Sequence, residues 1–358
     1  MQFNVKGITF NHDDLEKIEL TEIKTETISH AHYFHMLSDT RAILILRAGD
    51  FVEPSFITKY LEKGMNSLHQ LSIINKEDLL IYKQKWSQLK VAKTQILQMK
   101  VRDELIKKVS NDFWHSNEKS FLSFVIAAYE EFYQFEPLVL ENFQEKSMIM
   151  YTRTLLTSSI ATLVSLCNGI VDYKFIKDMY NTTFLLDYGM IAYDNFSYVM
   201  AQACEAERNR PGSGPDYLVN LKRSEREINL FKNHPELSYN IARDFEKDFT
   251  YPEVLDLILL HHEKCDGSGF PKGYSYSGIS DTATLLMFCD YMIPFEEHIF
   301  SVGDGQRILY DYFKNLSSNE SKYLLPINKV LASWEGMMAW AKDINQKIVD
   351  ECEEEVAS

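Results

Sequence analysis

LILLHHEKCDGSGFPKG, residues 257–273, places two adjacent histidines and an acid directly before a glycine-rich turn. The residues before it predict a helix that begins at Pro252, because proline is well suited to the first helical turn. The buried face of this helix is predicted to consist of Val254, Leu255, Ile258 and Leu259. The same spacing continues to His261 and His262, which are therefore expected to point inward.

Two inward imidazoles at the end of an apolar face need polar partners. Core histidines that are satisfied by backbone carbonyls are one interpretation, and a lone histidine would favour it. Here His261 and His262 are adjacent and are followed by Glu263 and by a turn rich in glycine. This combination favours a functional site over a structural one.

Composition limits the class of protein. The chain has 358 residues, of which 45% are hydrophobic, so it has room for two domains and a large core. Lys and Arg total 37 against 52 Asp and Glu, which gives a formal charge of -15. Such a molecule repels polyanions, so we expect neither a nucleic-acid partner nor a membrane partner unless a local basic patch provides the binding.

The cysteines and the N-terminus suggest a cytoplasmic protein. The five cysteines are odd in number, widely spaced and without a C-x-x-C pair, which disfavours disulfides and a thiolate zinc site. Cys265, inside the quoted stretch, is expected to be a passive thiol. The first residues, MQFNVKGITF, lack the pattern of a signal peptide. The uncharged segment 154–171 contains several Thr and Ser residues, so we interpret it as a buried helix and not as a membrane helix.

Changes in pattern along the chain predict three parts. Residues 1–74 mix a β-branched run (RAILILRAGDF) with a short amphipathic helix (PSFITKYLEKG) and indicate a small α/β module. Residues 75–146 predict a helical connector, in which Tyr82, Leu89 and Ile96 recur every seven residues. This stripe is expected to pack on its own chain, with a dimer coil as the alternative. Residues 147–358 are predicted to be helical.

Two segments in the last part are expected to lack regular structure. The stretch NRPGSGPD, residues 209–216, is rich in Gly, Pro and Ser and predicts a mobile loop. The chain ends in ECEEEVAS, which predicts a solvated, disordered acidic tail.

The string HHExxDGxGxP, from His261 to Pro271, resembles the signature of the HD-GYP family, metal-dependent phosphodiesterases of cyclic di-GMP, with Phe270 where the family has tyrosine. Further landmarks follow the family's order between residue 147 and about residue 301. These are an acid in LLDYGM (Asp187), the histidine of NHPEL (His234) and the acid of MFCD (Asp290). The resemblance implies a mainly α fold, with an all-helical HD-GYP-like domain after the small module and the connector.

The resemblance also implies a metal site. In the family, two iron or other divalent ions share a hydroxide that attacks phosphorus, and imidazoles and carboxylates hold them. Asp187 resembles the carboxylate that bridges the two ions. His234, His261 and His262 resemble ligands of one metal, and Asp290 resembles a ligand of the other. Around these ligands, the resemblance assigns supporting or turn positions to Glu263, Asp266, Gly267, Gly269 and Pro271. Glu263 has two interpretations, an acid that orients a ligand imidazole or a solvated acid at a helix end.

Several residues that the family requires are absent. The histidine of its His-Asp pair is Leu186 here, and the lysine that contacts substrate phosphate is Met190. The histidine of the first helix should fall near residues 151–154, but the chain has none between Ser116 and Asn233. After Asp290, where the family has basic residues, the sequence has Glu296 and Glu297. Simpler single-metal HD hydrolases also use the first-helix histidine and the His-Asp pair, so neither catalytic format is intact.

These departures leave three hypotheses for function. The first, which we favour, is a pseudoenzyme of cyclic di-GMP-related signalling that binds a signalling protein or a nucleotide such as cyclic di-GMP. It would hold at most one divalent transition metal, iron, manganese or zinc, and a homodimer is compatible with it. The alternative is an active phosphodiesterase with an incomplete metal site, so whether the chain is an enzyme stays open. A purely structural helical domain explains the retained ligand set least well.

One further histidine pattern carries little functional weight. His30 and His32, in SHAHYFH, alternate as on one face of a strand. They lack an acid or a cysteine at ligand spacing, so surface or half-buried histidines are expected.

Overall fold

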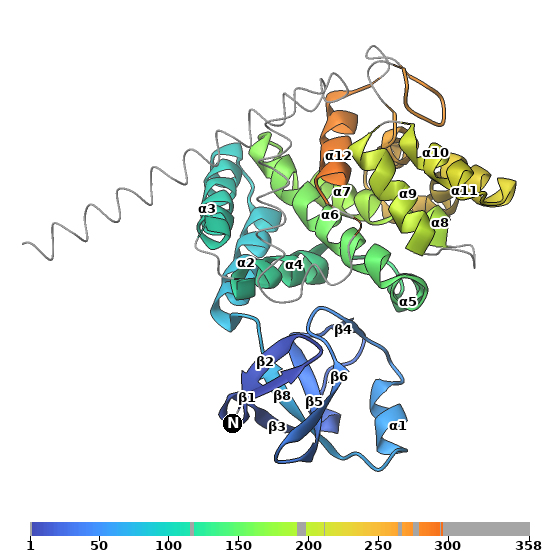
Figure 1. Ribbon diagram of the computed structural model, residues 1–358. Coiled ribbons are helices and arrows are strands. Elements are labelled where there is room, and N and C mark those ends of the chain that lie inside the picture. Colours follow the sequence, from blue (N-terminus) through green and yellow to red (C-terminus); the bar gives the residue numbers. More distant parts are fainter. Residues whose placement is uncertain are drawn as a thin grey trace, which may run out of the picture.

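The computed structural model describes residues 2–114, 118–191, 198–210, 212–263, 267–274, 279–293 and 295. A small β-rich module lies beside a larger body of helices, as Figure 1 shows. The predicted fold class, mainly α with a small sheet module at the N-terminal end, is confirmed. The acidic tail, Glu296, Glu297, Asp266 and Cys265 lie outside the residues that the structure describes.

The N-terminal module is built from antiparallel strands. β1 (Gln2–Val5) and β2 (Ile8–Asn11) form a hairpin. A four-stranded sheet has the order β3 (Glu16–Glu19), β8 (Ser67–Ser72), β5 (Ala31–Ser38) and β6 (Arg41–Leu46). β4 (Thr27–Ile28) pairs with β7 (Phe51–Val52), and the remaining elements are η1 (His12–Asp14), η2 (Leu20–Glu22) and α1 (Phe56–Leu61). The module therefore contains the strand and the short helix that the sequence predicted, β6 and α1.

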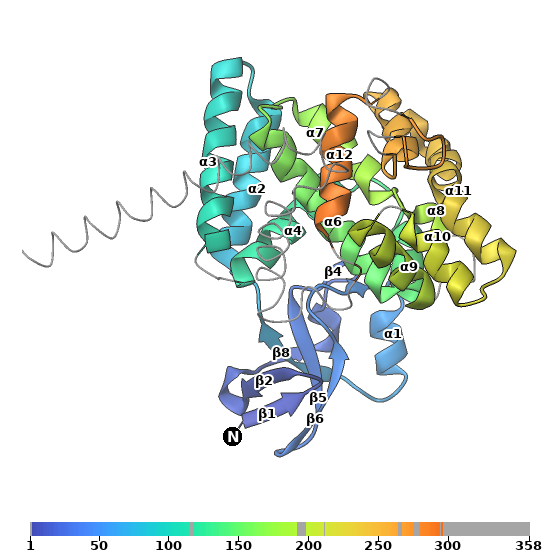
Figure 2. The ribbon, with the colours of Figure 1, turned by 45° about the horizontal axis from the view of Figure 1, so that its top comes forward.

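The predicted connector consists of separate helices, α2 (Lys76–Val91), α3 (Gln95–Trp114), α4 (Glu118–Phe132) and α5 (Pro137–Lys146). α2 and α3 run side by side in Figures 1 and 2. Tyr82 and Leu89 are buried in the core that the helices share, but Ile96 is 85% exposed. The expected stripe therefore breaks after Leu89, because the chain turns between α2 and α3.

The remaining helices are α6 (Met148–Cys167), α7 (Tyr173–Phe184), α8 (Tyr188–Ile191), α9 (Tyr198–Asn209), α10 (Ser213–Asn220), α11 (Glu225–Ala242), η3 (Arg243–Asp248), η4 (Pro252–Leu260) and α12 (Asp281–Met292). Of these, α7 and α12 pack against α6. α6 is buried along nearly its whole length, as expected for its uncharged part. Among the described residues, no helix has the length and apolar character needed to cross a membrane.

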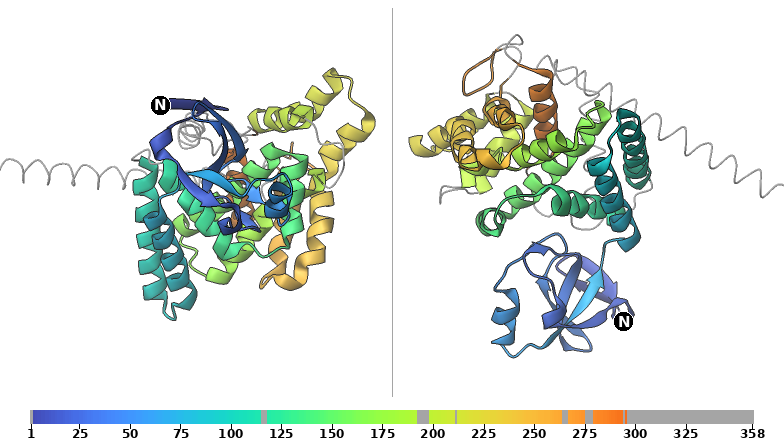
Figure 3. Two further views of the ribbon diagram at one scale, coloured as in Figure 1. Left: turned by 90° about the horizontal axis from the view of Figure 1, so that it is seen from below. Right: turned by 180° about the vertical axis from the view of Figure 1, so that it is seen from behind.

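The module and the helices share side-chain contacts. The Tyr151 hydroxyl donates to the Gly49 carbonyl at 2.7 Å. The Gln144 side chain, on α5, bonds both backbone groups of Phe51, at 2.7 Å and 3.1 Å. Ile28 and Phe51 belong to the same buried cluster as the helices. The right-hand view in Figure 3 shows the module at one end of the helical body. The boundaries after residues 74 and 146 stay predictions.

One local prediction was wrong and a second was right only in part. In the expected mobile loop 209–216, of which Pro211 is not described, Asn209 ends α9, Gly212 lies in a turn and α10 begins at Ser213. The Glu207 carboxylate fixes this turn, because it accepts the backbone N–H groups of Gly212 (3.0 Å) and Gly214 (3.1 Å). The helix predicted from Pro252 is present as a 3₁₀ helix, so its side-chain phase shifts. Leu257 is buried and Leu259 is only half-buried.

Of the two alternating histidines in the SHAHYFH stretch, His32 differs from expectation and His30 does not. His32 is buried, with 1% of its surface exposed, and its Nδ1 accepts the Ala48 N–H at 3.0 Å. It is therefore a structural residue of the module core. His30 is half-buried, as expected, and its Nε2 lies 3.7 Å from a Glu130 oxygen on α4.

Candidate metal centre

A close approach of two helices brings the predicted ligands together. Gly189, on α8, packs against α11 so tightly that a Cβ on it would lie 2.5 Å from the Ser238 backbone nitrogen. The Gly189 N–H also donates to Ser238 Oγ at 2.8 Å. Only glycine permits this approach, and it holds Asp187, two residues earlier, against His234 of α11. The Asp187 Oδ1 to His234 Nε2 distance is 3.2 Å.

Backbone carbonyls fix the orientation of two imidazoles. His234 Nδ1 lies 2.6 Å from the Phe231 carbonyl, and His261 Nδ1 lies 2.6 Å from the Ile258 carbonyl. A carbonyl oxygen can only accept, so each Nδ1 carries a hydrogen. In the neutral rings, Nε2 is therefore the free base, and both Nε2 atoms point to Asp187. His261 Nε2 lies 3.6 Å from Asp187 Oδ1 and 3.1 Å from His234 Nε2.

The turn after the histidines closes over them. The buried Glu263 carboxylate accepts the backbone N–H groups of Lys272 and Tyr274, each at 2.7 Å. The solvated alternative for Glu263 therefore does not apply, and its observed bonds hold the turn. Phe270 stacks on His262 with ring centroids 4.6 Å apart, and its N–H donates to the His262 carbonyl at 3.1 Å.

Glycines allow the shape of this turn. Gly267 and Gly273 have positive φ angles of 78° and 67°, a conformation that favours glycine. Gly269 and Pro271 lie in the same turn, both half-buried. Of the predicted supporting residues, Asp266 is outside the described part of the chain.

The second oxygen of Asp187 has a different partner. Arg153, on α6, donates from Nη1 to Asp187 Oδ2 at 2.7 Å. Its Nη2 donates to Asp290 Oδ1 at 2.6 Å and to the Asp290 carbonyl at 2.7 Å. Asp290, predicted as a ligand of the other metal, is thus joined to Asp187 through a guanidinium. Four side chains have ligand atoms within 4.8 Å of one another: those of Asp187, His234, His261 and His262. Asp290 is not one of these four.

The electrostatics of the four-residue group favour a cation. Burial alone raises the pKa of Asp187, but His234, His261 and Arg153 outweigh it and hold that pKa well below its ordinary value. Burial lowers the pKa of His261, yet Asp187 and Asp290 give it a net upward shift. The negative field that favours a proton on His261 Nε2 equally favours a metal ion there. Three imidazoles and a carboxylate therefore fit a divalent transition metal.

The predicted phosphate-contacting position is apolar. Met190 is completely buried on α8, and the Cys204 thiol lies 3.9 Å from its sulfur. Burial raises the pKa of the Cys204 thiol well above its ordinary value, so it supplies no thiolate. Leu186, at the position of the family's histidine, is also buried. Neither residue offers a donor to a phosphate.

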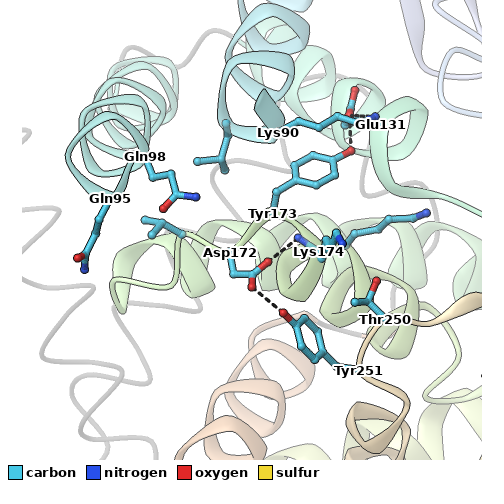
Figure 4. A pocket seen from close by; sticks show the side chains of 12 residues that line it. Lys90, Gln95, Gln98, Glu131, Asp172, Tyr173, Lys174, Thr250 and Tyr251 are labelled. Atoms are coloured by element: carbon cyan, nitrogen blue, oxygen red, sulfur yellow. Dashed lines mark hydrogen bonds and ion pairs between the residues drawn. The ribbon is translucent and has the colours of Figure 1, made fainter. Parts of the chain in front are cut away.

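A separate pocket lies away from these residues. It has a volume of about 810 Å³ and lies between α2, α3 and α7. Figure 4 shows Asp172 accepting from Tyr251, and Lys90 beside Glu131. Its charged lining residues are Lys90, Lys174, Lys177, Glu131 and Asp172. Acids thus offset much of the basic charge, and none of the predicted site residues lines the pocket.

Arg153 is the site residue that sequence reasoning missed. The absence of a histidine near residues 151–154 was interpreted as a loss. A signal was nevertheless present, because Arg153 is the sole charged residue in α6, MIMYTRTLLTSSIATLVSLC. A lone charge in a buried helix needs a buried countercharge, which here comes from two acids.

Comparison with known proteins identifies the class of domain. Residues 213–306 match the family model of the HD domain. The cyclic di-GMP phosphodiesterase response regulator RpfG of Xanthomonas campestris pv. campestris (strain 8004) is 33% identical over 69 residues, 19% of this chain and 18% of that protein. The resemblance inferred from the motif is confirmed, and the chain carries an HD-GYP-like HD domain.

The matches have limited extent. The chain spans only 18% of the length of the curated relative that it matches. Among solved structures, Bd1817, an HDG"Y"P protein from Bdellovibrio bacteriovorus, is 17% identical. That comparison covers 84% of this chain and 99% of Bd1817, with a TM-score of 0.33.

Proposed function

We propose that this protein is a pseudoenzyme of cyclic di-GMP-related signalling, in which the HD-GYP-like domain holds at most one metal ion and binds a nucleotide or a signalling protein. The observation that carries this proposal is the contrast between two halves of one site. One ligand atom from each of Asp187, His234, His261 and His262 lies within 4.8 Å of the others, a spacing that supports a metal site. Beside them, the position expected to contact phosphate is the buried, uncharged Met190.

The metal would be iron, manganese or zinc, held by the Nε2 atoms of His234 and His261, by His262 and by Asp187 Oδ1. When bound, it supplies positive charge to a substrate oxygen and acidity to bound water. The chain's own contribution is to orient the imidazoles through the Phe231 and Ile258 carbonyls. Such support typically changes metal affinity by 10–100-fold.

Hydrolysis is expected to be absent or very slow. Loss of one preorganised donor, as at Met190, typically costs about 2–4 kcal/mol of transition-state stabilisation. Loss of one of two metals costs several kcal/mol more, although the two effects need not add because they act on the same charge. At 1.36 kcal/mol for each factor of ten, the combined loss reaches about five orders of magnitude.

The test combines turnover and binding. Purified protein is loaded with Mn²⁺ and assayed for cyclic di-GMP hydrolysis and, by calorimetry, for cyclic di-GMP binding. We expect no turnover, also in Leu186→His/Met190→Lys, because the first-helix histidine is still absent. Turnover on the order of 1 per second or faster, abolished by His262→Ala, would sink the proposal. Absence of both turnover and nucleotide binding would leave a protein partner as the ligand.

The retained ligand set favours a second candidate function, a phosphodiesterase with an incomplete metal site. Its observation is that all four ligand atoms lie within 4.8 Å. The turnover measurement decides between the two. We also propose a signalling protein as a partner, a homodimer and a cytoplasmic location. The turnover measurement does not depend on these three points.

A further inference from the structure

We infer that the Arg153 guanidinium permanently occupies the position of one of the two metal ions of the HD-GYP family. The site then holds one metal ion and one guanidinium. This inference rests on the proposed function, because it explains why at most one metal binds. Its starting observation is that Arg153 joins Asp187 and Asp290. These two acids are the ones that the sequence assigned to the missing metal.

The contacts of Arg153 leave it little freedom. Nη1 binds Asp187 Oδ2, Nη2 binds two oxygens of Asp290, and Nε donates to the Ile293 carbonyl at 3.2 Å. The guanidinium carbon lies 3.9 Å from the centre of the Phe295 ring, a cation–π contact. Only 2% of the side chain is exposed. A metal ion that bound the same oxygens would have to displace these hydrogen bonds.

The charge balance explains why a cation is required there. Asp187 and Asp290 are both buried, at 5% and 6% exposure, and two unpaired buried carboxylates are strongly unfavourable. A guanidinium stays charged at all physiological pH values and matches carboxylates with parallel N–H groups. The guanidinium therefore neutralises Asp187 and Asp290 as the missing metal ion would, without depending on metal supply.

A guanidinium in place of a metal ion lacks one chemical property of the metal. A metal ion can accept a water or substrate oxygen as an additional ligand, whereas a guanidinium only donates hydrogen bonds. All three guanidinium nitrogens of Arg153 are already engaged with protein oxygens. Arg153 thus holds the carboxylates of Asp187 and Asp290 in place and excludes the metal ion that these two acids would otherwise bind.

The experiment compares Arg153→Lys, Arg153→Met and Arg153→His with the parent protein. Each is stripped with a chelator, reloaded with excess Mn²⁺, desalted and measured for bound manganese and melting temperature. We expect one manganese per parent chain and per Arg153→Lys chain. Arg153→Met should melt lower when stripped and gain more from Mn²⁺ than the parent. Arg153→His, with an imidazole beside the two acids, should approach two manganese per chain.

A second comparison covers the case in which Arg153→Met does not fold. If Arg153 serves to neutralise Asp290, the double variant Arg153→Met/Asp290→Asn should fold and melt above Arg153→Met, because one unpaired charge is gone. The inference is overturned if the parent binds two manganese. It is also overturned if Arg153→Met melts like the parent, or if Asp290→Asn gives no rescue.

These outcomes are separate from those of the proposed function. Hydrolysis by a parent protein that holds one manganese would overturn the pseudoenzyme proposal and leave the role of Arg153 intact. Two manganese in a parent protein without turnover would overturn the role of Arg153 and the one-metal part of the proposed function, and would leave the absence of hydrolysis intact.

Discussion

The Nε2 atoms of His234 and His261 face each other at 3.1 Å, although both rings already use Nδ1 to hold a carbonyl. Two neutral rings in this arrangement would place two lone pairs against each other. A cation between them, either a metal ion or a proton on one ring, removes that repulsion. A metal ion bound by this pair would therefore couple metal content to the packing of α11 against η4.

The first prediction concerns the metal and stability. Because the four ligands come from the residues after α7, from α11 and from the end of η4, a bound metal ties these segments together in the native state alone. At 100 times its dissociation constant, such a ligand stabilises the native state by about 2.7 kcal/mol. His261→Ala should lose bound metal and, with it, several degrees of melting temperature.

The exposed His12 provides the control for this experiment. His12→Ala should keep both metal content and melting temperature. Adding a chelator should lower the melting temperature of the parent and of His12→Ala, but change that of His261→Ala little. Equal melting of parent and His261→Ala in both buffers would show that the metal does not stabilise the fold.

The sequence grouped Asp187, His234, His261 and His262, and the structure brings these side chains together, because each lies in a motif with local order. His261 and His262 precede a glycine turn, and Asp187 and His234 lie in short strings with the expected spacing. What it could not predict was the role of Asp290. That role depends on Arg153, which lies 137 residues away in the chain, and no local pattern encodes such a contact.

The second prediction tests the helix crossing at Gly189. Gly189→Ala places a methyl group 2.5 Å from the Ser238 nitrogen and must push α8 away from α11. Overpacking of this kind typically costs about 1–3 kcal/mol. Since Asp187 lies two residues away, metal affinity should fall together with the melting temperature.

Gly169→Ala is the matched control, because its added methyl group meets open space. Gly169 has a φ of 82°, so the variant also carries backbone strain of about 1–2 kcal/mol. It should therefore lose stability without losing metal. If both variants bind metal as the parent does, the crossing does not set the position of Asp187.

The third prediction concerns the turn. The Glu263 carboxylate accepts two backbone N–H groups, and Glu263→Gln keeps only one acceptor oxygen. Because these N–H groups are only partly buried, leaving one of them without an acceptor should cost about 1 kcal/mol, the lower end of the range for a buried donor. The melting temperature should fall, and proteolysis within residues 267–274 should become faster. Glu253→Gln, at an exposed position, should change neither, and equal proteolysis of both variants would contradict this role.

The errors in the fold predictions also arose from contacts that a local sequence pattern does not encode. Residues 209–216 have the composition of a loop, but Glu207 ties them down through Gly212 and Gly214. Ile96 has heptad spacing, yet the helix it would continue ends at Val91. In both cases tertiary or capping contacts outweighed a local pattern.

The last prediction is a pH dependence that comes from the β-rich module. Burial, followed by the charge of Arg47, lowers the pKa of His32 from 6.5 to about 4, and the neutral ring accepts the Ala48 N–H. Between pH 6.5 and about 4, His32 is protonated in the unfolded chain but stays neutral in the folded chain. Stability is therefore lost as the pH falls from 6.5 to 4, by a total of about 3 kcal/mol.

Asp50 opposes this trend, because burial outweighs its interactions with Arg47 and raises its pKa from 3.8 to about 6. The folded chain holds the Asp50 proton more tightly, so stability rises as the pH falls through the same range. The measurement must therefore compare His32→Gln with the parent, by urea unfolding between pH 4 and 7.5. Gln can accept the Ala48 N–H without titrating, so the stability of the parent relative to His32→Gln should decrease as the pH falls. The contributions of Asp50 and of the metal ligands cancel in this difference. A difference that is constant across the range would mean that His32 titrates alike in both states, against its burial and its bond to Ala48.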